Sequence, residues 1–333
     1  MIVTLIYGDG IGYEVINATR EIIDAATNVI EWDVQVAGAD ILEQYGTPLP
    51  EGTVESIKRN KIALKGPTGT PVGEGFRSVN VEIRKRLDLY ANLRPIKSFK
   101  GVEALHNDLD IVIVRENTEG LYIGQEEMID DDTALTKKII TGKASERIVK
   151  FTFDYAQRND RKRVTAVHKA NIMKLTDGLF LKSAKKIAQD YNAIEFNDKI
   201  IDALCMDMVM DPYKYDVLVA PNFYGDILSD LCAGLVGGLG YAPGANIGDD
   251  IAVFEAVHGT APDIVGLGIA NPTSAILSGC MMLGFMGLKN EEKLIENALK
   301  MMYQNGKQTY SINGKLNTNK FKDEIIKLIK NNA

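Results

Sequence analysis

The chain has 333 residues, of which 45% are hydrophobic and 25% charged, with a formal net charge of −7. This length predicts two domains, and the composition is typical of a globular protein rather than a disordered one. The acidic net charge argues against a general nucleic-acid-binding surface, and the apolar runs are too short to span a membrane. The chain starts with a strand-like segment at Ile2, which leaves no room for a targeting peptide. We therefore expect a cytoplasmic protein or a mature organelle-matrix form.

The predicted elements alternate between short β-rich runs and amphipathic helical stretches, which indicates an α/β protein. Strands are expected to begin near residues 2, 32, 61, 109, 163, 215 and 251. Helices are expected over 12–28, 79–89, 144–158, 175–190, 200–210, 225–236, 272–288, 290–304 and 320–331. The stretch 120–143 alternates polar and apolar side chains between turn signals, which predicts strands in an arm or a contact between protomers.

The first predicted strand leads into the turn GDGIG at 8–12. The glycine fingerprint of a Rossmann fold, counted from Gly8, needs a third glycine where this sequence has Tyr13. Glu31 or Asp33 lies at about the distance of the fingerprint's ribose-binding acid, but acids are so common that one match means little. The sequence therefore favours a tight strand-to-helix turn in which glycines take positive φ.

The stretch 73–95 combines groups that bind anions. Ser78 can cap the following helix, Asn80 and Arg84 share one helix face, and Arg94 lies on the next extended run. A helix N-terminus with a hydroxyl, an amide and guanidinium groups is a good receptor for carboxylates. The alternative is an ordinary amphipathic helix with a solvated basic face.

Two later strands end in charged side chains. Arg115 ends the run IVIVR, Tyr122 follows seven residues later, and Lys169 ends VTAVHK. Functional groups of α/β proteins gather where strands end, so we expect Arg115 to clamp a ligand and Tyr122 to act as an acid or orienter. Lys169 can act as a base if its pKa is lowered. A structural ion pair is an equal alternative for Arg115, and His168 is expected to be a core histidine.

Three aspartates have the character of a metal site. Asp226 and Asp230 lie one helical turn apart at the start of a predicted helix, and Asp202 opens an earlier one. Carboxylates without histidine or cysteine suit Mg²⁺ or Mn²⁺. The alternative is that these acids only favour the positive end of a helix dipole.

The loop 254–272 is dense in glycine, proline and small polar residues, so its backbone can approach a ligand closely. Within it, Asp263 can accept both hydroxyls of an adenosine ribose and would repel a 2′-phosphate.

Taken together, these stretches resemble one family over essentially the whole chain, the metal-dependent β-decarboxylating dehydrogenases of isocitrate, isopropylmalate and homoisocitrate. The overall amino-acid sequence is most similar to those of the NAD-dependent isocitrate dehydrogenases. The matching stretches are GDGIG at 8, KGPTGTPVG at 65, RSVNVEIR at 77, LDLYANLRP at 87, VRENTEGLY at 114, VHKANIMKLTDG at 167, NFYGDILSD at 222 and HGTAPDIVGLGIANP at 258.

The resemblance implies an isopropylmalate dehydrogenase-like two-domain α/β fold, not a Rossmann fold, with a cleft between the domains. The large nucleotide-binding domain would hold residues 1–98 and 249–333. The small dimerisation and substrate domain would hold 99–248, with an arm near 120–143.

The resemblance also implies the cofactor. Members that use NADP typically carry Lys-Tyr after HGTAP, whereas this chain has Asp263 and Ile264, so NAD is expected. The residues expected to bind it are Ile11, Lys65, Thr70, His258, Gly259, Thr260, Ala261, Asp263, Ile264 and Asn271.

The implied reaction is oxidation of isocitrate to 2-oxoglutarate and CO₂. Ser78 and Asn80 favour isocitrate, because isopropylmalate enzymes place apolar residues there; Arg84, Arg94 and Arg115 would hold the carboxylates. Mg²⁺ or Mn²⁺ on Asp226 and Asp230, with Asp202 from the partner protomer, would acidify the C2 hydroxyl. Lys169, donated across a homodimer interface, would take part in removing that proton, and Tyr122 would protonate the enolate. The alternatives are homoisocitrate or 3-isopropylmalate oxidation, or a non-catalytic regulatory subunit of a heteromeric enzyme.

Overall fold

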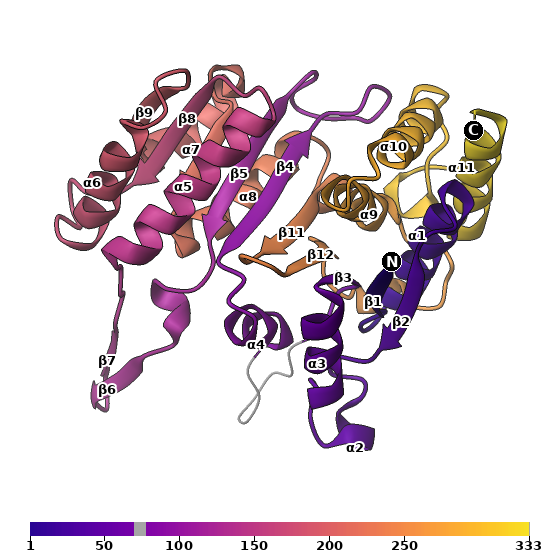
Figure 1. Ribbon diagram of the computed structural model, residues 1–333, viewed down its shortest axis with the longest axis horizontal. Coiled ribbons are helices and arrows are strands. Elements are labelled where there is room, and N and C mark those ends of the chain that lie inside the picture. Colours follow the sequence, from indigo (N-terminus) through magenta and orange to yellow (C-terminus); the bar gives the residue numbers. More distant parts are fainter. Residues whose placement is uncertain (70–77, 333) are drawn as a thin grey trace.

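The computed structural model describes residues 1–69 and 78–332, and its frame is one ten-stranded sheet (Figure 1). The strands are β1 (Ile2–Ile6), β2 (Glu31–Gln35), β3 (Ile62–Lys65), β4 (Ala91–Lys97), β5 (Asp110–Glu116), β8 (Arg163–His168), β9 (Glu195–Ile200), β10 (Val217–Ala220), β11 (Pro243–Ile247) and β12 (Ala252–Ala256).

The strands follow one another across the sheet in the order β2-β1-β3-β12-β11-β4-β5-β10-β8-β9. The pairs β12–β11, β11–β4 and β4–β5 are antiparallel, and the other neighbouring pairs are parallel. A Rossmann sheet is parallel and has a different strand order. The prediction of an α/β protein that is not a Rossmann fold is therefore confirmed.

Strand β5 shows why both faces of the sheet are covered by helices. Ile111 and Ile113 pack into one hydrophobic cluster, Val112 and Val114 pack into another, and all four are fully buried. Successive side chains of a strand point to opposite faces, so a continuous apolar run belongs to two cores at once.

One face of the sheet carries a single continuous core. The helices that cover it are α1 (Gly12–Ala26), α5 (Gly142–Arg158), α6 (Thr176–Ala188), α9 (Thr273–Phe285), α10 (Lys289–Gln304) and α11 (Thr318–Asn332). The two ends of the chain meet here, where the Lys322 ammonium of α11 donates to Glu21 of α1 at 2.6 Å. Thr141 precedes α5, and its hydroxyl caps that helix by accepting from the Ala144 N–H at 3.2 Å.

The opposite face carries two smaller cores with polar residues between them. Helices α3 (Glu51–Asn60) and α4 (Val79–Arg86) cover one core, and α7 (Ile201–Met210) and α8 (Asn222–Leu235) cover the other. Between them, strand alternation turns Asn92 and Arg94 of β4, Asn246 of β11 and Glu255 of β12 toward this face. Buried polar groups need partners, so this break in the core marks a place for a polar ligand.

The sheet order bears on the expected division into domains. Strands from 1–98 and 249–333 form one end of the sheet and strands from 99–248 form the other, except that β11 lies between β12 and β4. The sheet is continuous across the expected boundary. The two-domain division therefore remains an interpretation.

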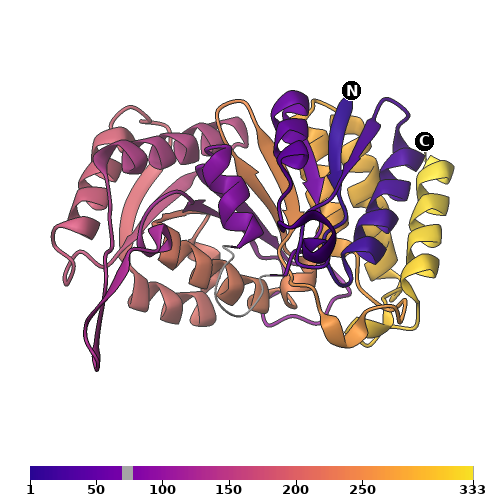
Figure 2. The ribbon, with the colours of Figure 1, turned by 90° about the horizontal axis from the view of Figure 1, so that it is seen from below.

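The predicted arm is a two-stranded antiparallel ribbon of β6 (Glu126–Asp130) and β7 (Thr133–Thr136). It extends away from the rest of the chain in both views (Figures 1 and 2). Met128 and Ile129 in it are 63% and 62% exposed. Apolar side chains exposed on an extended ribbon are typical of a surface that another chain covers.

Several elements differ from the sequence-based expectation. The helices α2 (Leu42–Tyr45) and α3 and the strands β9 and β11 lie in stretches for which no element was expected. Strand β9 is a polar edge strand without an apolar alternation, and PGANI in β11 has the composition of a turn. The remaining short elements are 3₁₀ turns at Leu121–Ile123, Pro212–Lys214, Leu239–Tyr241, Pro262–Ile264 and Tyr310–Ile312. Among the described residues, no helix combines the length and apolar character needed to cross a membrane.

Candidate active site

Arg115 and Tyr122 meet at one of the predicted metal ligands. The Arg115 guanidinium is 2% exposed and contacts one carboxylate oxygen of Asp226, while its Nε donates to Asn222 Oδ1 at 2.9 Å. The Tyr122 hydroxyl donates to the other Asp226 oxygen, and the Arg115 guanidinium lies 5.0 Å from the centre of the Tyr122 ring. Burial, reinforced by the hydrogen bond to Asp226, raises the pKa of Tyr122. The phenol therefore keeps its proton at neutral pH.

Helix α8 carries Asp226 and Asp230, but it begins at Asn222, so these acids open its second and third turns. Their expected place at the start of a helix is wrong, because the turn starting at Asn222 is already helical. Acids beyond the first turn gain little from the helix dipole, which removes the capping alternative for these two. Asp202 lies in the first turn of α7, so the alternative stays open for that residue. Gly225 allows α8 to lie against β5, since a Cβ there would come within 2.6 Å of the Arg115 side chain. The pair on one helix face remains a suitable donor set for a hard divalent cation.

A cavity of about 130 Å³ lies at the polar break between the two smaller cores. It is lined by Asn80, Arg84 and Arg94, which were expected to bind substrate, and by His258 and Gly259, which were expected to bind nucleotide. The tertiary structure thus brings the two predicted sets together, although they lie more than 160 residues apart in the chain.

Ser78 stands at the N-cap of α4, as the sequence predicts, but its hydroxyl makes no hydrogen bond to the backbone of that helix. The prediction that Ser78 caps α4 through its side chain is therefore wrong. Asn80 accepts a hydrogen bond from the Thr68 hydroxyl at 3.1 Å. Thr70, the neighbouring nucleotide-binding prediction, lies outside the described residues.

Glu255 is a buried carboxylate that lines this cavity, and the sequence analysis did not single it out. It lies 3.0 Å from the Lys65 ammonium and 3.1 Å from the Arg84 guanidinium, and it accepts from Asn246 Nδ2 at 2.7 Å. Although burial favours its neutral form, Lys65, Arg84 and Arg94 hold the pKa of Glu255 well below its usual range. Glu255 therefore fixes the cations around it. The only sequence signal was one acid inside the apolar strand AVFEA.

Lys65 is fully buried, and its ammonium also donates to the Gly66 carbonyl at 2.7 Å. Its expected contact with a nucleotide stays a prediction.

The Arg94 guanidinium is hydrogen-bonded through one nitrogen and has an unused donor on another. Its Nε donates to Asn92 Oδ1 at 2.8 Å, and Asn92 in turn donates to Asn246 Oδ1 at 2.8 Å. One terminal nitrogen of Arg94 is buried without a hydrogen-bond partner among the described residues. Burial lowers the pKa of Arg94 to about 10, so the side chain stays charged. A buried cation with an unused donor is prepared for an anion.

The loop after β12 lies against the glycine turn at the start of the chain. Gly8 and Gly10 take φ of +76° and +59°, which confirms the expected positive-φ turn. The Ile11 N–H donates to the Thr260 carbonyl at 3.0 Å, and a Cβ on Gly10 would lie 2.2 Å from that oxygen. Gly10 therefore allows the turn to touch the loop, whereas a Cβ on Gly8 would meet the Pro67 carbonyl oxygen at 2.0 Å.

Two side chains of this loop have unused polar atoms. His258 Nε2 and Asn271 Nδ2 are buried without a hydrogen-bond partner among the described residues. Burial lowers the pKa of His258, and Asn271 Oδ1 accepts from the Thr273 N–H at 3.1 Å, which fixes the amide. Ala261 takes the left-handed conformation, and Asp263 and Ile264 follow in a 3₁₀ turn with the Asp263 side chain exposed.

Lys169 and Asp202 form a separate part of the predicted site. The Lys169 ammonium lies 2.5 Å from the Asp202 carboxylate, and the Lys169 N–H donates to Asp177 at 2.7 Å. Among the described residues, no three histidine, cysteine or acidic side chains of this chain are grouped to hold a metal ion. Asp202 is therefore not brought to Asp226 and Asp230 within one chain. The neighbouring His168 is buried and contacts Asp198 at 3.0 Å, as expected for a core histidine.

Comparisons with known proteins identify the family. The model of the isocitrate/isopropylmalate dehydrogenase family matches residues 2–325. The chain is 48% identical to the probable alpha subunit of the mitochondrial NAD isocitrate dehydrogenase of Drosophila melanogaster, over 97% of this chain and 86% of that protein. It is 47% identical to a regulatory subunit of the mitochondrial NAD isocitrate dehydrogenase of Dictyostelium discoideum, over 98% and 91%. The crystal structure of isocitrate dehydrogenase from Methylococcus capsulatus matches with a TM-score of 0.95 at 49% identity, over 99% of each chain.

These relatives correct one expectation. The cytoplasmic location is contradicted, because the Drosophila and Dictyostelium relatives are both mitochondrial. The sequence held no positive signal for a compartment, and the expectation relied on the strand-like start of the chain. The alternative, a mature organelle-matrix form, agrees with these relatives. The match over nearly the whole chain and the shared fold confirm the resemblance drawn from the motifs: this chain belongs to the isocitrate/isopropylmalate dehydrogenase family.

Proposed function

We propose that the protein oxidises isocitrate with NAD and decarboxylates it to 2-oxoglutarate and CO₂, using Mg²⁺ or Mn²⁺. The observation that carries the proposal is the cavity in which Asn80, Arg84 and Arg94 meet the loop residues His258 and Gly259. Guanidinium groups there suit a substrate with several carboxylates, and the unused Arg94 nitrogen supplies a donor for one of them. Ser78, whose hydroxyl does not cap its helix, is available to a further carboxylate.

Two features support NAD as the cofactor. Asp263 presents an exposed carboxylate beside the loop, which suits two ribose hydroxyls and repels a 2′-phosphate. Asn271 holds its amide fixed and keeps an unused buried donor for a base.

Asp226 and Asp230 fit a hard divalent cation, because both are carboxylates on one face of α8. When bound, such a cation acts as a Lewis acid toward substrate oxygens. The chain's own residues position the substrate and move its protons. Asn222 holds the Arg115 guanidinium so that it can face a substrate carboxylate. The protonated Tyr122 can donate its proton to the carbon that loses CO₂.

A second copy of the chain would complete the site. Lys169 and Asp202 pair with each other and not with the Tyr122 cluster. The outer faces of α7 and α8 expose apolar side chains, with Val209 50% and Ile227 47% exposed, as at a surface covered by another chain. We therefore place Lys169 and Asp202 opposite the Tyr122 and Asp226 of a partner copy in a homodimer. Residues 1–98 and 249–333 would close on 99–248 around the substrate.

The direct test is absorbance at the reduced-nicotinamide band with purified protein and Mg²⁺, using either NAD or NADP, and with isocitrate, homoisocitrate or 3-isopropylmalate. We expect NADH formation with isocitrate and its loss on addition of a chelator. Turnover with 3-isopropylmalate or homoisocitrate in place of isocitrate would reassign the substrate.

The regulatory role named for the Dictyostelium relative favours a second candidate function, that of a non-catalytic subunit. The presence of Tyr122, Lys169 and the three aspartates argues against it. No turnover with any of the three acids, together with activation of a separate catalytic protein, would support the regulatory role.

A further inference from the structure

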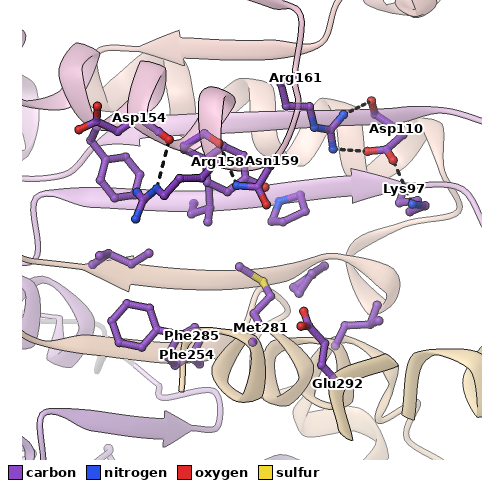
Figure 3. A pocket seen from close by; sticks show the side chains of 18 of the residues that line it. Lys97, Asp110, Asp154, Arg158, Asn159, Arg161, Phe254, Met281, Phe285 and Glu292 are labelled. Atoms are coloured by element: carbon purple, nitrogen blue, oxygen red, sulfur yellow. Dashed lines mark hydrogen bonds and ion pairs between the residues drawn. The ribbon is translucent and has the colours of Figure 1, made fainter. Parts of the chain in front are cut away.

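A second and larger cavity lies on the other face of the sheet (Figure 3). Its volume is about 810 Å³, within the range of about 300–1,000 Å³ typical of small-molecule sites. Helix α5 and the loop after it form one wall, and α9, α10 and β12 form the other. Neither the proposed substrate nor the proposed cofactor is expected in this cavity.

The two cavities share their strands. Phe254 of β12 lines the large cavity, whereas the adjacent Glu255 lines the small one. Likewise Leu93 and Pro95 of β4 line the large cavity, and Arg94 between them lines the small one. Side chains alternate along a strand, so Phe254 and Glu255 point to opposite faces of β12. A molecule bound against Phe254 would therefore contact the strand residue directly before Glu255.

One end of the large cavity combines aromatic surface with unpaired positive charge. Phe254 and Phe285 pack edge to face with ring centres 5.8 Å apart, and Arg158 lies on the opposite wall (Figure 3). The Arg158 Nε donates to the Asp154 carbonyl at 3.1 Å, and the guanidinium has no acidic partner among the described residues. Lys289, the first residue of α10, likewise forms no ion pair with a described residue.

The acid one helical turn before Arg158 is already paired. Asp154 is paired with Lys150 at 2.7 Å. Burial raises the pKa of Glu292. Farther along the same wall, the Arg161 guanidinium is already paired with Asp110 at 2.5 Å.

We propose that the end of the cavity between Arg158 and Phe285 binds a small organic anion with a planar aromatic body. Its anionic group would meet the Arg158 guanidinium, and its ring would lie against Phe254 and Phe285. Through the shared strands, its binding would also change the affinity of the small cavity for its substrate; this second statement alone rests on the proposed function.

The test uses 1-anilinonaphthalene-8-sulfonate, an aromatic sulfonate whose fluorescence rises in apolar surroundings. It is titrated into the intact assembly with saturating NAD, so that a nucleotide site is blocked. We expect saturable binding with a Kd of roughly 10–100 μM. Arg158→Gln and Phe285→Ala should each weaken that binding by about tenfold. Lys162→Gln is the matched control, because Lys162 is exposed on the loop that follows Arg158 and does not line the cavity.

Binding that is weakened by Arg158→Gln and Phe285→Ala but not by Lys162→Gln supports the site. Both target side chains are exposed, so neither variant should fail to fold. Absence of saturable binding, or equal affinity in all variants, would overturn the proposal. Neither result depends on turnover, so the site can be judged even if the proposed reaction is wrong.

The coupling is read from isocitrate kinetics with and without the dye. We expect a change in KM of at least about twofold in the wild-type protein, absent in Arg158→Gln. An unchanged KM at a saturating dye concentration would overturn the coupling.

Discussion

At the scale of single residues, the hydroxyl of Tyr122 is the group that the structure best prepares for proton transfer. It donates to Asp226, and burial raises its pKa. We predict that Tyr122→Phe lowers kcat for isocitrate by about a hundredfold and leaves KM within about threefold, because the ring and its contact with Arg115 are retained. Steady-state kinetics measure both constants. Tyr310→Phe, at an exposed tyrosine, is the control; an unchanged kcat in Tyr122→Phe would remove the proton-donor role.

Asp33, weighed first as a possible ribose ligand, has a structural role. Its carboxylate accepts from the Ser56 hydroxyl at 2.7 Å, from Asn60 at 2.9 Å and from Arg59 at 2.6 Å. Led by the Ser56 hydrogen bond, these partners lower the pKa of Asp33 to about 2. A lowered pKa means that the ionised group stabilises the folded state above its unfolded pKa of about 4, and that this stability is lost as pH falls toward 2.

We therefore predict that Asp33→Asn lowers the free energy of unfolding by about 1 kcal/mol at pH 7, after allowance for solvent screening, and by less as the pH falls from 4 to 2. Urea titrations at several pH values measure the difference from the wild-type protein. Asp190→Asn, at an exposed acid, should show no such pH dependence. A loss that stays constant between pH 7 and pH 2 would contradict the role assigned to the charge.

At the scale of elements, Asp177 in the first turn of α6 joins three segments. Its buried carboxylate accepts from the Lys169 N–H at 2.7 Å and from the Tyr224 hydroxyl of α8 at 2.9 Å, and it contacts the Lys138 ammonium next to the arm. It thus ties the helix that carries the candidate metal ligands to the backbone of Lys169.

We predict that Asp177→Asn lowers the melting temperature, because an amide in that place faces three donors and leaves the partly buried Lys138 ammonium without its counter-charge. It should also reduce kcat by more than it raises KM, since Lys169 is displaced while the arginines are not. Calorimetry and kinetics measure the two effects, with Asp190→Asn just beyond α6 as the control. A lower melting temperature with unchanged kcat would show that Asp177 supports the fold alone.

The loop after β12 gives a second prediction at this scale. Asp263 lies exposed in a 3₁₀ turn, and Ile264 beside it is half-buried and packs against the core, where a tyrosine keeps an apolar side chain. We predict that Asp263→Lys with Ile264→Tyr shifts kcat/KM toward NADP by at least about tenfold, because a cation then replaces the carboxylate that repels the 2′-phosphate. The ratio of kcat/KM for NADP and NAD measures the shift. Unchanged selectivity would refute our assignment of the cofactor loop.

At the scale of the whole molecule, a site shared between two copies predicts complementation. Lys169→Met and Asp226→Asn should each be inactive, because every site lacks one group. When the two chains are unfolded together and refolded as mixed dimers, one site of each heterodimer is intact. About a quarter of the wild-type activity should return, since half of random dimers are heterodimers and half of their sites are complete. Absence of recovered activity, with mixed dimers demonstrated by mass spectrometry, would place all groups of a site in one chain.

The sequence determined the local elements and the residue types of the site. The α/β alternation, the run IVIV of β5 and the apolar stripes of the long helices follow from side-chain periodicity, which is a local property. The positive-φ turn at Gly8 and Gly10 was also readable, because few residues other than glycine adopt that conformation freely. The family resemblance drew on eight such stretches at once.

Only the tertiary structure decided which of these stretches meet. Glu255 was unremarkable in the sequence, but strand alternation and sheet order place it beside Lys65 and Arg84. The large cavity arises because α5 and α9–α10 stand apart over the middle strands, a distance that no local pattern encodes. Propensity and periodicity act over a few residues, whereas β12 pairs with β3 across almost two hundred residues of sequence. The sequence therefore determined which chemical groups the protein has. The packing of distant strands decided which of those groups act together.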